Sequence, residues 1–218
     1  MARELQITQL PELVPYERGV QLQEELREQV QDGALPDQLL LLEHEPVYTC
    51  GRRTKPGELP MGADWYRAQG IEICDADRGG AVTYHGPGQL VGYPIMRIGS
   101  VHEYVANLER VIITALADQG VEAEVREGLT GVWASTGKIG SIGVHVSRGV
   151  TTHGFAVNVD NDLQPFEWVV PCGMEGVQMS SICKEIGRDG HMESFSEAVV
   201  ARLCEALDRE ARVVASSV

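Results

Sequence analysis

Hydrophobic residues recur with the period of an α-helix in three segments of the chain, residues 16–31, 100–120 and 194–207. The first segment is followed by Gly33, and glycine is typical of the position just after a helix. The second and third each begin with a serine followed three residues later by a glutamate, which is the pattern of a capping box. These pairs are Ser100 with Glu103 and Ser194 with Glu197. The pattern therefore predicts three principal helices.

Short apolar segments between these helices predict β-strands. They cover residues 38–42, 47–50, 71–74, 89–96, 121–125, 131–134, 139–146 and 153–159. Strands do not alternate one for one with helices, as they would in a doubly wound parallel sheet. No repeat, low-complexity tract or linker divides the chain. The sequence predicts one α+β domain over residues 1–218, with mixed β-sheets and flanking helices.

Composition and charge narrow the possible partners. The chain has 218 residues, of which 43% are apolar, and its formal net charge is −14. This charge repels a polyanion, so we expect no nucleic-acid partner. No apolar run approaches the ~20 residues of a membrane-spanning helix, and the N-terminus lacks a signal pattern. We therefore expect a soluble cytoplasmic protein that does not bind membranes. The densest basic cluster, Arg52, Arg53 and Lys55, falls in a loop that we expect to be exposed.

The five cysteines do not form a disulfide or zinc pattern, because their number is odd and no C-x-x-C pair occurs. No metal site is expected. Cys74 and Cys204 lie in apolar segments and are interpreted as small buried side chains. Cys172 differs, because it follows an apolar run and lies between Pro171 and Gly173 in a predicted turn. It is either a candidate nucleophile or a loop cysteine without a chemical role.

Glycine-rich segments at 78–89, 137–143 and 152–156 indicate either tight turns or close approach of the backbone to a ligand. Lys138 follows a glycine, as in a phosphate-binding loop. That motif fails, because the preceding glycine is one residue too distant and Ile139 replaces the serine or threonine. No G-x-G-x-x-G pattern opens a helix either. The sequence therefore predicts no nucleotide cofactor.

A nucleophilic cysteine needs a base or a positive charge beside it, because only a few per cent of a free thiol is ionised near neutrality. Lys138, His145 or His153 could meet this need for Cys172. Each of these three residues also has an interpretation without a catalytic role. A lysine is commonly a solvated surface charge, and a histidine on a strand is commonly a hydrogen-bonded core residue.

The run RGGAVTYHGPGQLVGYP at 78–94 resembles the signature of the octanoyltransferases of lipoate biosynthesis. The His-Gly-Pro-Gly-Gln part of this run is specific to that family. The resemblance continues in order through residues 43–52, 137–143, 153–158 and 171–173. Two residues depart from the family pattern: Glu45 replaces a frequent second proline, and Cys50 replaces an aliphatic residue. Neither departure affects the implied chemistry.

This resemblance implies that an octanoyl group passes from octanoyl-acyl carrier protein to a lysine, through an acyl-thioester on Cys172. The implied acceptors are the lipoyl domains of 2-oxoacid dehydrogenase complexes and the glycine cleavage H protein. The resemblance also implies the fold of biotin and lipoate protein ligases, no cofactor, and Lys138 as the group that lowers the pKa of Cys172. The residues implied to line the acyl site are Arg78, Gly79, Gly80, Ala81, Val82, Thr83, Tyr84, His85, Ser141, Ile142, Gly143, His153, Gly154, Phe155 and Ala156.

Three alternative functions share parts of this pattern. An ATP-dependent lipoate or biotin-type protein ligase would have the same fold but would activate a free acid. A non-catalytic module would only bind the acyl carrier, and a cysteine hydrolase would admit water to the thioester. Exchange between thioesters is nearly balanced and amide formation is downhill, so the transferase needs no nucleotide. If the protein is the transferase, we expect Arg52, Arg53 and Lys55 to dock the acidic carrier. The alternative is that these residues form only a solvated loop.

Overall fold

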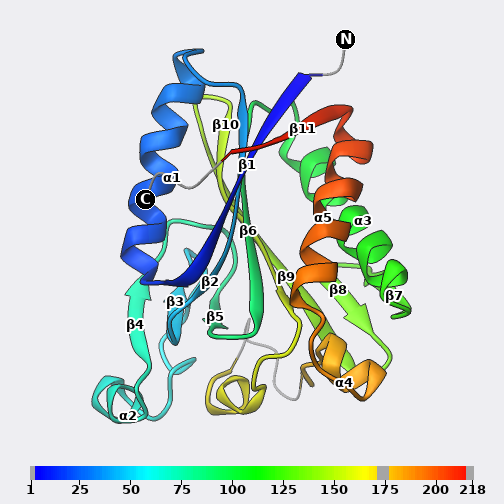
Figure 1. Cartoon of the computed structure of the whole chain (residues 1–218). Helices are drawn as coiled ribbons and strands as arrows, with labels where there is room; N and C mark the ends of the chain where they lie inside the picture. The colour runs from blue at the N-terminus through cyan, green and yellow to red at the C-terminus, as the bar shows by residue number, and fades with distance from the viewer. Residues whose placement is uncertain (1–2, 171–176, 215–218) are drawn as a thin grey trace.

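A mixed sheet of eight strands runs through the molecule, in the order β11-β1-β2-β6-β10-β9-β8-β7 (Figure 1). The structure is a computed structural model that describes residues 3–170 and 177–214, so Cys172 lies outside the described residues. The strands are β1 (Arg3–Val14), β2 (Asp37–His44), β6 (Gln89–Ile95), β7 (Ala123–Arg126), β8 (Leu129–Ala134), β9 (Gly137–Ser147), β10 (Val150–Asn158) and β11 (Arg209–Val213). β1 is parallel to both of its neighbours, and the other pairs are antiparallel.

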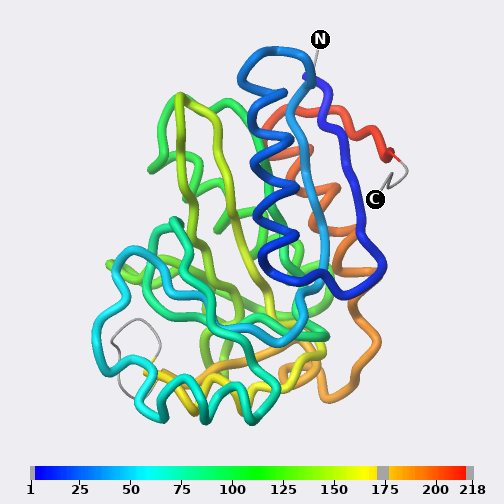
Figure 2. The backbone as a smooth tube through the Cα atoms, turned by 90° about the vertical axis from the view of Figure 1, so that its left-hand side faces the viewer, coloured from blue at the N-terminus to red at the C-terminus, as the bar shows by residue number. Residues whose placement is uncertain are grey.

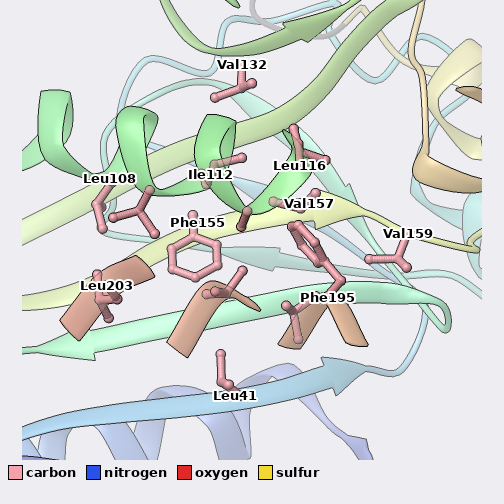
Figure 3. Packing of buried hydrophobic residues seen from close by; sticks show 14 of the residues in the cluster. Leu41, Leu108, Ile112, Leu116, Val132, Phe155, Val157, Val159, Phe195 and Leu203 are labelled. Carbon is pink, nitrogen blue, oxygen red and sulfur yellow. The ribbon is translucent and has the colours of Figure 1, made fainter. Parts of the chain in front are cut away.

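Helices cover both faces of this sheet. Helix α1 (Tyr16–Gln31) lies on one face, and α3 (Val101–Asp118) and α5 (Met192–Leu207) lie side by side on the other (Figure 1). The larger core fills the space between α3, α5 and the sheet, where Phe155 of β10 lies among leucine and isoleucine side chains (Figure 3). A second core lies beneath α1. No helix of the described residues is long and apolar enough to cross a bilayer.

A second, three-stranded sheet in the order β4-β3-β5 lies at one end of the large sheet. Figure 2 shows this part of the chain, in cyan, at the end of the molecule opposite the start of β1. Its core is largely aromatic and includes Tyr48, Tyr66, Tyr84 and Phe166. The elements at this end are β3 (Val47–Cys50), α2 (Ala63–Ala68), β4 (Glu72–Asp75), β5 (Val82–His85), the 3₁₀-helix η1 (Gln164–Trp168) and α4 (Ile182–Ile186).

The predicted α+β class with mixed sheets is confirmed, and so are the three principal helices. The predicted cap of α3 is present, because the Ser100 side chain accepts a hydrogen bond from the backbone N–H of Glu103. The predicted start of the last helix is wrong. Helix α5 begins at Met192, and Ser194 lies inside it.

The start of α5 depends on a contact that is distant in sequence. The Asp160 carboxylate accepts hydrogen bonds from the backbone N–H groups of Gly190 and His191, each at 3.1 Å. It thereby satisfies donors at the beginning of the helix, as a capping side chain would. The Ser194 hydroxyl donates instead to Gln119 at the end of α3. Local spacing predicted the helix, and a tertiary contact determines where it begins.

Strands β1, β5 and β11 and helix α2 were not predicted from the sequence. β1 contains Pro11, and its register against β2 shifts between Gln9 and Leu13, which obscures the alternation expected of a strand. Side chains of β11 are mostly exposed. An ion pair of 2.9 Å between Arg209 and Asp37 attaches this strand to the sheet, together with its backbone pairing to β1.

Two glycines allow β6 and β10 to pack tightly where they pass the three-stranded sheet. A side chain at Gly92 would overlap the ring of Phe155, and one at Gly154 would overlap the Gly92 carbonyl. The two strands pair antiparallel, with Phe155 opposite Gly92. Glycine is required at both positions because a side chain would have no space there.

Candidate active site

A cavity of about 350 Å³ lies where the two sheets meet. Its walls come from β5, β6, β9, β10 and the start of β8, from Tyr16 at the start of α1, and from loop residues at 53–58, 78–81 and 128. The antiparallel register of β9 and β10 brings the glycine-rich segments at 137–143 and 152–156 together here. Gly143 pairs with Gly154, and Ser141 pairs with Ala156.

Most of the residues predicted to line an acyl site lie on this cavity. They are Arg78, Gly80, Ala81, Val82, Thr83, His85, Ser141, Ile142, Gly143, His153, Gly154, Phe155 and Ala156, and Lys138 lies there with them. Gly79 and Tyr84 do not line it. The ring of Tyr84 packs against Tyr48 and Phe166 in the aromatic core, on the other side of β5. Cys172 lies outside the described residues, so its position relative to the cavity is not described.

Lys138 is buried on the cavity wall, with 6% of its surface exposed. Its backbone N–H donates to the carbonyl of Gln178, and its carbonyl accepts from the N–H of Ser180, both at 2.9 Å. The side chain passes close to the α-carbon of Gly131, where an added Cβ would come within 2.7 Å of its Cε atom. These contacts place the lysine against residues 178–180, a few residues after Cys172 in the sequence.

A carboxylate on α4 holds this junction together. Glu185 accepts hydrogen bonds from the hydroxyls of Ser135, Thr136 and Ser180, and from the backbone N–H of Thr136, at 2.5 to 3.1 Å. Burial alone would raise its pKa, but these four hydrogen bonds outweigh burial and lower it to about 2. Glu185 therefore stays ionised and joins the turn before Lys138 to the chain after residue 177.

Two buried histidine rings are uncharged, that of His85 on the cavity wall and that of His44 packed against it. Burial holds the pKa of His85 well below its ordinary value and lowers that of His44 to about 4. The His44 ring donates from Nδ1 to the Val14 carbonyl and accepts from the Tyr93 hydroxyl, at 2.7 and 2.6 Å. These aromatic groups satisfy their hydrogen bonds within the protein, and such a wall can face an apolar ligand.

Arg78 connects the wall to a buried chain of hydrogen bonds. Its guanidinium donates to the Thr49 hydroxyl at 2.6 Å, and Thr49 Oγ1 lies 3.4 Å from His85 Nε2. His85 Nδ1 donates to the side-chain carbonyl of Gln89, whose NH₂ group donates to Asn158. Each side chain fixes the orientation of the next. The chain links the glycine-rich segment at 78–89 to β10.

Asp77 forms a second network with a histidine of β9 and a histidine of β10. The Asp77 carboxylate is 2.6 Å from His153 Nε2 and 3.6 Å from His145 Nε2. The hydrogen bond with His153 is the main cause that lowers the pKa of Asp77 to about 2. His153 has a φ of +57°, a backbone conformation that is uncommon outside glycine. Arg52 donates to His145 Nδ1 at 2.7 Å, which attaches the basic loop to β9.

Sequence reasoning missed several residues of the site. Glu58 and Tyr16 line the cavity but belong to no motif that was singled out, and Tyr93 lies within the run at 78–94 but was not named as a site residue. Asp77 directly precedes Arg78, and this position next to the family signature was the only available signal. In the described part of the chain, no group of three or more His, Cys, Asp or Glu side chains could hold a metal ion.

The layers and the cavity between two sheets define a protein with the fold of lipoate and biotin protein ligases. A lipoate-protein ligase A solved with ATP superposes with a TM-score of 0.79 at 16% identity, covering 100% of this chain and 90% of that chain. The biotin protein ligase from Aquifex aeolicus in complex with biotin and ATP gives 0.57 at 14% identity, covering 94% and 70%. Identities this low establish the fold alone.

Sequence relatives define the family more narrowly. The model described as the lipoyl protein ligase A/B catalytic domain matches residues 15–204. An octanoyltransferase from Rubrobacter xylanophilus is 42% identical over 207 residues, 93% of this chain and 94% of the relative. One from Mycobacterium ulcerans is 45% identical over 207 residues, 89% and 85% of the two chains. This chain belongs to the octanoyltransferase family and is an acyltransferase, which confirms the predicted resemblance.

The low pKa of Glu185 predicts a specific pH dependence of stability. The folded-state pKa of about 2 lies below the ordinary value of 4.5, so the stabilisation is complete above pH 4.5 and is lost as the pH falls toward 2. Glu185→Gln should lower the free energy of unfolding by roughly 1–2 kcal/mol at pH 7, because the carboxylate is partly exposed. Urea denaturation at pH 7, 5, 4 and 3 measures this difference.

The difference between wild type and Glu185→Gln should shrink between pH 4.5 and 3. Glu197→Gln, on the exposed side of α5, is the matched control and should show little difference at any pH. A difference for Glu185→Gln that stays constant over this range would show that the ionised carboxylate is not the stabilising group.

Proposed function

We propose that this chain transfers an octanoyl group from octanoyl-acyl carrier protein to a lysine of lipoyl-dependent protein domains, through an acyl-thioester on Cys172. The acceptors would be the lipoyl domains of 2-oxoacid dehydrogenase complexes and the glycine cleavage H protein. The observation that carries this proposal is the position of Lys138, buried on the cavity wall and hydrogen-bonded to residues 178 and 180. We also infer that residues 1–218 act as one catalytic domain, since β1 and β11 pair in the same sheet.

In the first half-reaction, the Cys172 thiolate attacks the thioester carbonyl carbon of the carrier. A new carbon–sulfur bond forms and the bond to the carrier sulfur breaks. The departing carrier thiolate takes a proton from the Lys138 ammonium. In the second half-reaction, the acceptor amine attacks the acyl-enzyme, neutral Lys138 accepts a proton from its nitrogen, and Cys172 leaves as a thiolate. Both groups return to their starting states, so the cycle needs no nucleotide.

The cavity wall suits an acyl chain. The octanoyl group has seven carbons beyond its carbonyl, and at about 0.8 kcal/mol per buried CH₂ their burial contributes at most roughly 5 kcal/mol. Glycine backbone from β9 and β10 and the uncharged rings of His85 and Tyr93 provide surfaces that cost little to desolvate. One carbon more or less should change binding about fourfold through transfer free energy alone. Sharper selectivity requires a steric stop in the cavity.

Intact-mass spectrometry tests the covalent step. Wild-type protein incubated with octanoyl-acyl carrier protein and no ATP should gain the mass of one octanoyl group, located on Cys172 by peptide mapping. Cys172→Ser should remain unmodified and lose transfer by at least about a thousandfold, because a hydroxyl is ionised far less than a thiol. Transfer that requires ATP and survives in the serine variant would identify an ATP-dependent ligase instead.

The proposed role of Lys138 predicts different effects of two substitutions. Lys138→Ala should move the pH profile for alkylation of Cys172 to higher pH, because a nearby positive charge favours the thiolate. It should also slow both half-reactions. Lys138→Arg should keep the profile near that of wild type but slow transfer to the acceptor, since guanidinium does not release a proton near neutrality. An unchanged alkylation profile in Lys138→Ala would contradict the ion-pair role.

The basic loop is proposed to dock the acyl carrier. Arg53 and Lys55 are exposed and line the cavity, and Arg52 bonds to His145 beside them. Because the protein carries a charge of −14, an acidic partner needs such a local patch to approach. Reversing these three charges to glutamate should lower kcat/KM for octanoyl-acyl carrier protein about tenfold at low salt.

Two controls make this prediction specific. Turnover of a small octanoyl thioester should change much less than turnover of the carrier. Reversal of three exposed arginines that do not line the cavity, Arg110, Arg188 and Arg212, makes the same change in net charge and should affect the carrier less. Equal losses in the two triple variants would place the carrier elsewhere on the surface.

A further inference from the structure

Glu58 is the single acidic side chain among the described residues that line the cavity. The same wall carries four cationic side chains, those of Arg53, Lys55, Arg78 and Lys138. Only 4% of the Glu58 surface is exposed. Burial of a carboxylate is unfavourable unless something compensates for its lost hydration, so its presence in a ligand cavity calls for a physical reason.

The contacts of Glu58 within the protein do not supply that compensation. Its Oε2 atom accepts one hydrogen bond, a long one of 3.3 Å from the backbone N–H of Val82. In the described part of the chain, none of the ion pairs within 4.0 Å includes Glu58. A glutamine could accept the same hydrogen bond at this position. The negative charge is therefore not explained by the fold.

The backbone of Glu58 places this charge beside the chain that leads to Cys172. Its carbonyl accepts a hydrogen bond of 3.0 Å from the N–H of Val170, two residues before Cys172 in the sequence. Its N–H donates to the carbonyl of Lys55 in the basic loop, at 3.2 Å. The backbone of Glu58 thus joins the basic loop to Val170, the last described residue before Cys172 in the sequence.

The acceptor substrate brings a cation to the site. A lysine side chain has a pKa near 10.4, so at pH 7 roughly one in 2,500 is uncharged and the rest arrive as ammonium groups. In the acyl-enzyme, where Lys138 is neutral, the three remaining cations of the wall repel an ammonium group, and the one buried carboxylate attracts it. A hydrogen bond between an ammonium and a carboxylate is among the stronger ones in proteins, especially where water is largely excluded.

We propose that Glu58 binds the ε-ammonium of the acceptor lysine and positions it in the cavity before it attacks the acyl-enzyme. This inference rests on the proposed function, because it requires an acyl group held for transfer to an amine. Amide formation removes two protons from the ammonium group: one passes to water before the amine attacks, and neutral Lys138 takes the second as the new bond forms, so Glu58 need not take either. The carboxylate holds the positively charged form close to the groups that deprotonate it.

The test uses two nucleophiles that differ in charge. Octanoylated enzyme is mixed either with a lipoyl domain, whose lysine is cationic, or with hydroxylamine, which is uncharged at neutral pH. Loss of the octanoyl adduct is followed by intact mass, and the ratio of the two rate constants is the measured quantity. Glu58→Gln keeps the size of the side chain and an acceptor for Val82, so it removes mainly the charge.

For Glu58→Gln, the ratio of the lipoyl-domain rate to the hydroxylamine rate should fall about tenfold or more at pH 7. The deficit should shrink at pH 9.5, where more of the lysine is neutral. Glu58→Asp, which retains the charge, should recover part of the ratio. Glu127→Gln removes an exposed charge next to the cavity-lining residue Gly128 and should leave the ratio as in wild type.

The possible outcomes separate this inference from the proposed function. If wild-type enzyme forms no octanoyl adduct, or its adduct is not discharged by the lipoyl domain, the proposed function fails. If wild type behaves as proposed and Glu58→Gln slows both nucleophiles equally, Glu58 is only a structural contact and the inference is overturned. An unchanged ratio in Glu58→Gln overturns it as well.

Discussion

The two backbone hydrogen bonds of Lys138 connect the sheet that forms the cavity to the chain that follows Cys172. They cross from β9 to residues 178 and 180, and the close approach is possible because residue 137 is a glycine that directly faces Gln178. Glu185 holds the same junction from the side of α4. Because its backbone is held by these hydrogen bonds, Lys138 has little freedom to leave the cavity. The role proposed for it, to act on a thiol, requires such a fixed position.

The side chains in and beside the cavity are of two kinds, neutral hydrogen-bonded rings and charged groups. Rings such as those of His85, His44 and Tyr93 are polar, but their hydrogen bonds are made within the protein and the histidines are held neutral. Such rings suit an apolar acyl chain. The charged groups gather around Lys138, the basic loop and Glu58. Under the proposed function, these charged groups would interact with the thioester, the acidic carrier and the cationic amine.

The fold alone would not have distinguished a transferase from a ligase. A lipoate-protein ligase A that was solved with ATP shares the architecture over the whole chain at 16% identity. The side chains on the shared frame make the difference, and the relatives at 42% and 45% identity are octanoyltransferases. A frame that presents glycine backbone from two paired strands can bind an acyl group whether or not a nucleotide activates it.

Local patterns in the sequence determined the principal helices, the strands β6, β9 and β10, and the glycine-rich segments of the site. These features depend on the period of apolar residues or on the absence of side chains, and both are visible along the chain. The resemblance to a known family also marked Lys138 and Cys172. Strand β11 was missed because its pairing with β1 joins the two ends of the chain, and few of its side chains are buried.

Tertiary structure alone decided the roles of three acidic residues. Asp160 marks the beginning of α5, Glu185 joins a turn to a helix, and Glu58 lies inside the cavity. In the sequence each is one of 32 acidic side chains in a chain with a charge of −14, and nothing local distinguishes it from a solvated surface group. The effect of a charge depends on its burial and its partners, and here most of the partners lie 24 to 50 residues away. Only the folded chain brings them together.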